Sequence, residues 1–122
     1  MERLSGKELA GINGFLVHKD KLIVGVTSDH SLKSVDLKSK AIGTIIRFGE
    51  GVIDGIKVDQ DGNFLISHYE GRIYRVTPDG KFTRLLYVQE ERCADFEFIP
   101  EKNLLVIPTL ETSELMCYKL KN

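Results

Sequence analysis

The stretch IDGIKVDQDGNFLISHYEGRIYRVTPDGKF, residues 53–82, decides the fold class. It contains four short apolar runs, separated by glycine turns at residues 61–62, 70–71 and 79–80. Short runs rich in β-branched and aromatic residues, bounded by Asp-Gly and similar pairs, predict antiparallel strands joined by hairpins. The stretch also opens with Asp54-Gly55, a pair that separates no two of these runs. Turn chemistry alone leaves the role of that acid open.

The chain repeats itself with a period near 40 residues. At a shift of 41, INGFLV (residues 12–17) falls on IDGIKV (residues 53–58). A further shift of about 40 brings CADFEF (residues 93–98) to the same place, and FLIS (residues 64–67) then meets LLVI (residues 104–107). A period of this length that carries four strand-like runs is typical of propeller blades. Helical solenoids of similar period would show helical spacing of apolar residues over longer segments.

The fold class that we predict is all-β, with three four-stranded antiparallel blades. In the second repeat we expect strands at 53–59, 63–68, 72–77 and 81–88. The second strand of each repeat is apolar on both faces, which a strand buried between neighbouring blades requires. We treat residues 1–122 as a single partial propeller domain with three sequence repeats. These repeats cover residues of about 12–50, 51–90 and 91–122. The alternative is another antiparallel sandwich of short hairpins, because its turns recur at similar intervals.

The expected strands are enough for three blades, and one of these blades is divided between the two ends of the chain. Aligning Asn13 with Asp54 places residues 3–9 opposite the fourth strand of the next repeat, so we expect an extra outer strand there. Three blades are fewer than the minimum of about four that a closed ring needs. We therefore expect either a homodimer that closes a six-bladed ring, or a piece of a longer polypeptide that carries the missing blades. An isolated monomer would expose edges and apolar faces.

Composition excludes several functions. The net charge is −1 and the basic residues are scattered, so we expect no nucleic-acid partner. No apolar run approaches the roughly 20 residues of a membrane helix, and the N-terminal segment lacks the apolar core of a secretion signal. We therefore expect a cytoplasmic protein with no membrane partner. Two cysteines do not make a disulfide framework, so Cys93 and Cys117 are expected to be reduced and buried.

The pattern DGIKVDQDGNFLIS…GRIYRVTPDGKFTRLL, together with the tail ADFEFIPEKNLLVIPTLETSELMCYKL, resembles a known family. This family is the six-bladed propellers of the senescence-marker-protein and gluconolactonase type, also called regucalcin-like. The resemblance covers nearly the whole chain and places it in the C-terminal half of a full propeller. It implies a metal-dependent hydrolase of lactones or esters, with a divalent metal, often calcium, at one mouth of the central channel.

The resemblance also implies two metal ligands in this chain. The Asn-Gly ligand of the family matches Asn13-Gly14, and its Asp-Gly ligand matches Asp54-Gly55. The first-blade Glu and the remaining Asn belong to blades that this chain lacks. Oxygen atoms that converge from different blades suit a hard cation, although Asn and Asp before Gly are also common turn formers. Asp95 is a weaker candidate because it is offset by one residue from the matching position, which would turn it to the other side of its strand.

The loops after the second strands supply candidates for substrate contact. In a propeller these loops share a rim with the connections that lead into the inner strands. They are TSDHS (residues 27–31), SHYEG (residues 67–71) and TLETS (residues 109–113). The candidate substrate-binding residues are Asp29, His30, His68, Tyr69 and Glu111. The alternative is that they are solvated loop residues without a role in binding.

Two functions follow from these observations. The first is part of a metal-dependent lactone or ester hydrolase, whose substrate is a small molecule and whose site is not complete in this chain. The second is a non-catalytic propeller module used for binding or assembly. No catalytic residue is assigned, since the sequence contains no nucleophile elbow, no phosphate-binding loop and no zinc-ligand spacing.

Overall fold

The protein is described here by a computed structural model that covers residues 3–88 and 92–121. Within those residues it is all-β, apart from two short 3₁₀ helices, η1 (Lys7–Leu9) and η2 (Pro100–Lys102). Three antiparallel sheets follow one another along the chain. The first sheet contains β1 (Ile12–His18), β2 (Lys21–Val26), β3 (Ser31–Asp36) and β4 (Ile42–Arg47). The second contains β5 (Ile53–Val58), β6 (Phe64–His68), β7 (Arg72–Val76) and β8 (Phe82–Tyr87). The third contains β9 (Glu97–Ile99), β10 (Leu104–Pro108) and β11 (Leu115–Lys119).

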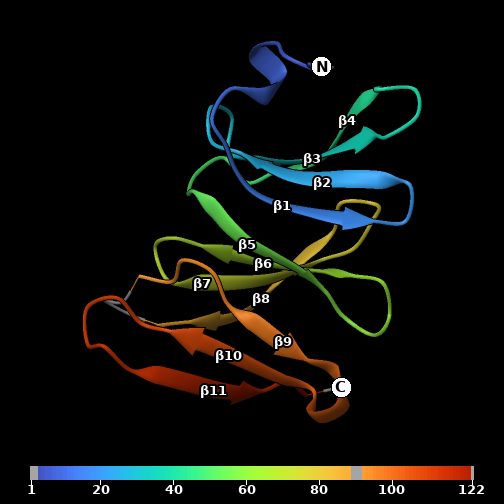
Figure 1. Cartoon of the computed structure of the whole chain (residues 1–122). Coiled ribbons are helices and arrows are strands. Elements are labelled where there is room, and N and C mark those ends of the chain that lie inside the picture. Colours follow the sequence, from blue (N-terminus) through green and yellow to red (C-terminus); the bar gives the residue numbers. More distant parts are fainter. Residues whose placement is uncertain (1–2, 89–91, 122) are drawn as a thin grey trace.

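The sheets are stacked as propeller blades, which confirms the predicted fold class. Each is a meander in which neighbouring strands in sequence are hydrogen-bonded neighbours in the sheet. The first strands of the blades lie next to one another, with β1 against β5 and β5 against β9. Figure 1 shows the three blades in succession, the N-terminus beside the first and the C-terminus beside the third. The inner strands therefore share one side of the molecule, and the loops between blades reach its rims.

Two cores hold the blades together, one at each contact between sheets. Between the first and second sheets, Ile23 and Leu32 pack against Phe64 and Ile66. Between the second and third sheets, Leu65 and its neighbours pack against the third sheet. Every residue of β6 is buried, with its side chains alternating between the two cores. The prediction that the second strand of a repeat is covered on both faces is confirmed for this strand.

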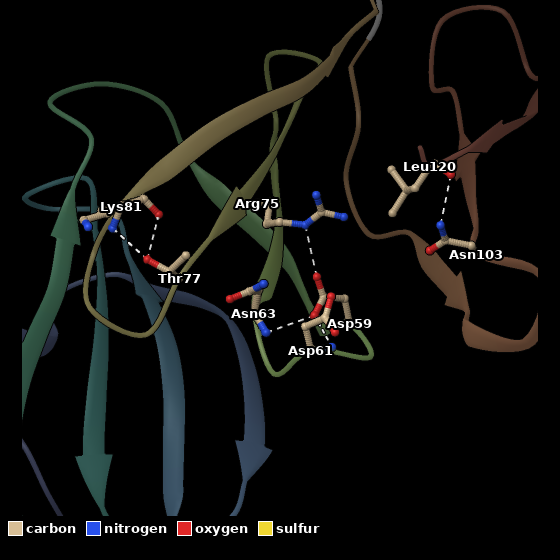
Figure 2. Close-up of polar contacts among 8 residues, drawn as sticks. All are labelled: Asp59, Asp61, Asn63, Arg75, Thr77, Lys81, Asn103 and Leu120. Carbon is tan, nitrogen blue, oxygen red and sulfur yellow. Dashed lines mark hydrogen bonds and ion pairs between the residues drawn. The ribbon is translucent and has the colours of Figure 1, made fainter. Parts of the chain in front are cut away.

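Buried Asp59 organises the turn between β5 and β6. Its Oδ1 accepts the backbone N–H of Asp61 at 2.9 Å and that of Asn63 at 3.0 Å, and its Oδ2 accepts Arg75 Nε at 3.0 Å (Figure 2). Aspartate favours turns because its carboxylate bonds the backbone a few residues on. Thr77 does the same at the next turn, where its hydroxyl accepts the Lys81 N–H at 3.0 Å. These polar turns lie at the rim opposite the predicted site.

The prediction of a strand at residues 3–9 is wrong for the single chain. The segment carries η1, and hydrogen bonds from Leu9 N to Gly6 O and from Ala10 N to Lys7 O close its turns. The third sheet, the strand's expected partner, lies at the far end of the stack from the N-terminus (Figure 1). A strand without a neighbour leaves its backbone groups unpaired, so local bonds replace it.

The cysteines follow the prediction in part. Both are free thiols, as expected, and Cys93 is buried. Cys117, however, is exposed, because β11 is the outermost described strand of the third sheet and no further blade covers that side chain.

Candidate functional site

The two predicted metal ligands lie at matching irregularities in the inner strands. Asn13 is the second residue of β1 and Asp54 the second residue of β5. The pairing of β1 with β2 shifts just after Ile12, and that of β5 with β6 shifts just after Ile53. Both side chains therefore belong to a β-bulge, a feature that changes the direction of side chains at barrel rims and near binding sites. Neither residue stands in a hairpin turn.

The glycines after these residues are required by close contact between blades. A Cβ atom on Gly14 would lie 1.6 Å from the carbonyl oxygen of Asp54. A Cβ atom on Gly55 would lie 2.7 Å from Asp95 Oδ1 and 2.8 Å from Phe96 Cδ1. Each glycine thus lets one inner strand touch the next. Gly55 is therefore needed for packing between blades, and Asp54 stands directly before it. Turn chemistry could not explain this pair.

Asp54 lies close to a second carboxylate. Partial burial, and then the negative charge of Asp95, raise the pKa of Asp54 above its ordinary value. Asp95 is largely exposed, and its Oδ1 lies 3.8 Å from Lys57 Nζ. The sequence made Asp95 a weaker candidate ligand than Asn13, yet it is the charge of Asp95 that affects the pKa of Asp54.

Within one chain, Asn13 and Asp54 are not accompanied by a cluster of acidic, histidine and cysteine side chains among the described residues. In that part of the structure no group of three or more His, Cys, Asp or Glu side chains could hold a metal ion. Asn13 and Asp54 offer two side chains, whereas calcium takes about six to eight oxygens.

His30 and His68 meet at the rim between the first and second blades. His30 lies in the loop after β2 with a left-handed backbone, φ 54°, and its Nδ1 donates to the Gly51 carbonyl at 2.7 Å. His68 ends β6 and is 1% exposed. A Cβ on Gly51 would lie 2.6 Å from His68 Nδ1, so the segment that His30 holds passes directly over the His68 ring.

His68 is a buried, uncharged group. Among the described residues neither ring nitrogen has a hydrogen-bond partner. Its ring packs edge-on against Phe48, with centroids 4.6 Å apart, and lies 4.8 Å from the ring of Tyr74. Burial lowers the pKa of His68 to about 4, and the negative charges of Glu70 and Glu50 only partly oppose this. The structure places this predicted substrate-contact residue in the packing between two blades, where it is buried.

Tyr69 and Glu111 meet through an arginine that sequence reasoning missed. Arg92 Nε lies 2.9 Å from Glu111 Oε1, and its backbone N–H donates to Glu111 Oε2 at 3.0 Å. The guanidinium also lies 5.6 Å from the centre of the Tyr69 ring. The three side chains link the loops of the second and third blades at the rim. Only the position of Arg92 at the start of the third repeat could have indicated it, because a lone arginine carries no motif.

Asp29 is engaged in a structural network. Its carboxylate accepts the Ser31 hydroxyl and lies 3.1 Å from Lys33 Nζ and 3.4 Å from Arg47 Nε. These bonds, the Ser31 hydroxyl first, hold the pKa of Asp29 below its ordinary value. The structure thus distributes the predicted site residues among separate clusters on one rim. A surface hollow lies between the first two blades, and its lining includes His18, Asp20 and Gly62.

The fold agrees with known propellers. The chain is similar to the WD40 β-propeller domain of Doa1, with a TM-score of 0.75, 10% identity, and coverage of 90% of this chain and 37% of that one. It is similar to a catalytically inactive His-to-Ala variant of virginiamycin B lyase from Staphylococcus aureus with quinupristin, with a TM-score of 0.64, 14% identity, and coverage of 89% and 41%. It thus spans about two fifths of either propeller.

A third similar structure has nearly the same length as this chain. The computationally designed Ika4 protein matches with a TM-score of 0.58 and 10% identity, over 98% of this chain and 96% of that one. No protein-family model and no curated protein matches the sequence. At these identities the likeness establishes a β-propeller fold and does not establish the gluconolactonase family. No described helix is long and apolar enough to cross a membrane.

Proposed function

We propose that the chain is a non-catalytic assembly and binding module, in which two copies close a six-bladed ring. The observation that supports this is the exposure of apolar side chains on the two end faces of the stack. Phe15 on the first sheet is 68% exposed, and Leu115 on the third sheet is 68% exposed. The ring would present the rim loops of both copies to a ligand or partner.

The repeats indicate what these exposed side chains lack. Phe15 pairs with Val24 across the first hairpin as Ile56 pairs with Ile66 in the second sheet, and Ile56 is only 3% exposed. The first blade covers Ile56, and no blade among the described residues covers Phe15. Burial of a large apolar side chain contributes about 1.5–3 kcal/mol.

The opposite end face shows the same difference. Leu32 and Ile73 are the second residues of the third strands of their sheets and are 0% exposed, whereas Leu115, at the start of β11, is 68% exposed. In a two-fold ring the third sheet of each copy would pack against the first sheet of the other. Two-fold symmetry would form this contact twice, so both end faces of both copies would be covered.

Solution mass tests the proposal. Light scattering coupled to size-exclusion chromatography should give twice the 13.8 kDa of the single chain. Phe15→Glu should raise the dimer dissociation constant at least tenfold, because a charge cannot be buried unpaired. Leu37→Glu is the matched control, since Leu37 is exposed and lies in the turn between β3 and β4, outside the strands that form the end faces. A wild type that stays at 13.8 kDa at millimolar concentration rejects the proposal.

A second candidate is the metal-dependent hydrolase of lactones or esters, and the Asp54–Asp95 pair favours it. The negative charge of Asp95, which raises the pKa of the partly buried Asp54, is the electrostatic situation that a bound cation relieves. A ring of two copies would bring two such pairs and two Asn13 side chains to one channel. We expect calcium to bind the ring and not the monomer. Calorimetric titration of wild type and Asp54→Asn tests this, and binding that survives the substitution places the ion elsewhere.

A further inference from the structure

The outer edge of β11 is an open strand edge among the described residues. In the first two sheets the third strand has a fourth on its outer side, β4 beside β3 and β8 beside β7. The third sheet ends at β11. An unpaired edge presents a row of N–H and C=O groups that can accept another strand.

The spacing of the repeats identifies a segment of this chain that fits that edge. In the first sheet Leu32 pairs with Ile46, which precedes the first inner-strand residue of the next blade, Ile53, by seven positions. In the second sheet the equivalent residue of β8 is Leu86, which pairs with Ile73. Leu86 likewise precedes, by seven positions, the buried Cys93 that leads into the next blade.

Counted back from Ile12, the same spacing falls on Ser5. The residue of β11 that corresponds to Leu32 is Leu115, the first of its strand. Ser5 of one copy would therefore stand opposite Leu115 of another.

In the single chain this segment is folded back over the first sheet. The Nζ of Lys33, which is 3% exposed, donates to the Glu8 carbonyl at 2.7 Å. Figure 1 shows η1 next to the first sheet, on the side away from the second. The second blade does not cover this side of the first sheet. The side chains of Val24 and Val26 are nevertheless each only 1% exposed.

The folded-back form is held weakly. Helix η1 has three residues, none of them buried, and Leu4 is 42% exposed. The backbone of Gly6 has φ 155° and ψ 168°, a region that is essentially restricted to glycine. Extended strand geometry at the same position suits any residue, as Arg47 shows at the corresponding end of β4.

We infer that residues 3–9 are an exchangeable strand: they cover the first sheet in the single chain, and in the two-copy ring they pair with β11 of the partner as its fourth strand. This inference rests on the proposed self-association. The segment leaves the first sheet when the partner's third sheet takes its place, so one movement uncovers a face and completes a blade. The interaction surface for the second copy therefore consists of the end faces together with the β11 edge.

Gly6→Ala tests the exchange by changing the equilibrium between the single chain and the dimer. Alanine disfavours the folded-back backbone and tolerates the strand, so the dimer dissociation constant should fall at least tenfold. Gly43→Ala is the matched control, because Gly43 lies in β4 and an added Cβ meets only Ser34 Oγ, at 3.5 Å. That control should leave the constant within about twofold.

Disulfide trapping between two chains tests the geometry. One chain carries Ser5→Cys and the other Leu115→Cys, both with Cys117→Ser, so that a bond between the new cysteines joins different molecules. Oxidation of the mixture should give a covalent dimer, and a peptide map should locate the bond. Lys38→Cys replaces Ser5→Cys as the control, because residue 38 lies in the turn between β3 and β4.

The outcomes separate the two proposals. A dimer with the 5–115 bond and a stronger association of Gly6→Ala supports the exchange. A dimer without that bond, whose dissociation constant is the same for Gly6→Ala and wild type, overturns the exchange and leaves the self-association standing. Absence of a dimer in wild type and in Gly6→Ala at millimolar concentration overturns both.

Discussion

Acidification should weaken the fold through His68. The folded-state pKa of about 4 lies below the 6.5 of an unfolded histidine, so folding favours the neutral ring. The sign follows from linkage: the full contribution is present above pH 6.5, and it is lost as the pH falls toward 4. Between pH 7 and pH 5 the two values correspond to a loss of about 2 kcal/mol in the free energy of unfolding.

The measurement compares pH slopes rather than absolute stabilities. Urea unfolding of wild type, His68→Phe and His68→Leu at pH 7, 6 and 5 gives the free energy of unfolding for each. The wild type should lose about 2 kcal/mol more than either variant over this range. Tyr74→Phe is the control, because it keeps the ring that packs on His68 and should keep the wild-type slope.

The charged groups around His68 act on its pKa in both directions. The carboxylates of Glu70 and Glu50 favour the protonated ring, while Arg72 and His30 disfavour it. Burial between Phe48 and Tyr74 outweighs the carboxylates because the charged ring would lose its water. Equal pH slopes for wild type and both His68 variants would refute the reasoning.

Two further predictions concern the turn and the inner strands. Asp59→Ala should lower the free energy of unfolding by about 2–3 kcal/mol, since it removes two backbone hydrogen bonds and an ion pair (Figure 2), while Asp61→Ala in the same turn should cost about 0.5 kcal/mol or less. Urea unfolding at pH 7 distinguishes them, and equal losses would contradict the role of Asp59. Gly14→Ala should cost about 3 kcal/mol or more because its Cβ would overlap the Asp54 carbonyl, whereas Gly43→Ala should change stability by less than about 1 kcal/mol. Thermal unfolding of both variants checks this, and similar melting temperatures would show that the inner strands separate easily.

Parts of the candidate site were accessible from the sequence and parts were not. The Asn13-Gly14 and Asp54-Gly55 pairs stand out because they recur at a shift of 41 and fall outside the hairpin turns. The sequence could not show that His68 is buried, because burial depends on Phe48, which comes from the preceding blade. It also could not show that Arg92 joins Tyr69 to Glu111.

One part of the repeat alignment was wrong by a single residue. Aligning FLIS with LLVI places Leu65 opposite Leu105, yet both side chains pack in the core between the second and third sheets. Because they meet from opposite sides of that core, they cannot occupy equivalent positions in their blades. The side chain that corresponds to Leu105 belongs to the other face of β6, where Phe64 and Ile66 lie. Apolar residues on both faces of these strands hide such a shift from sequence comparison.

The sequence by itself determined the elements of this protein: short antiparallel strands, the turns between them and the repetition of one blade. These depend on residues only a few positions apart, through the alternation of side chains and the conformations that Gly, Asp and Asn allow. Tertiary structure alone decided which rim residues meet, why Gly14 and Gly55 must lack a side chain, and how residues 3–9 fold. Those outcomes depend on contacts between blades about 40 residues apart, and on whether a neighbouring sheet is present to pair with a strand.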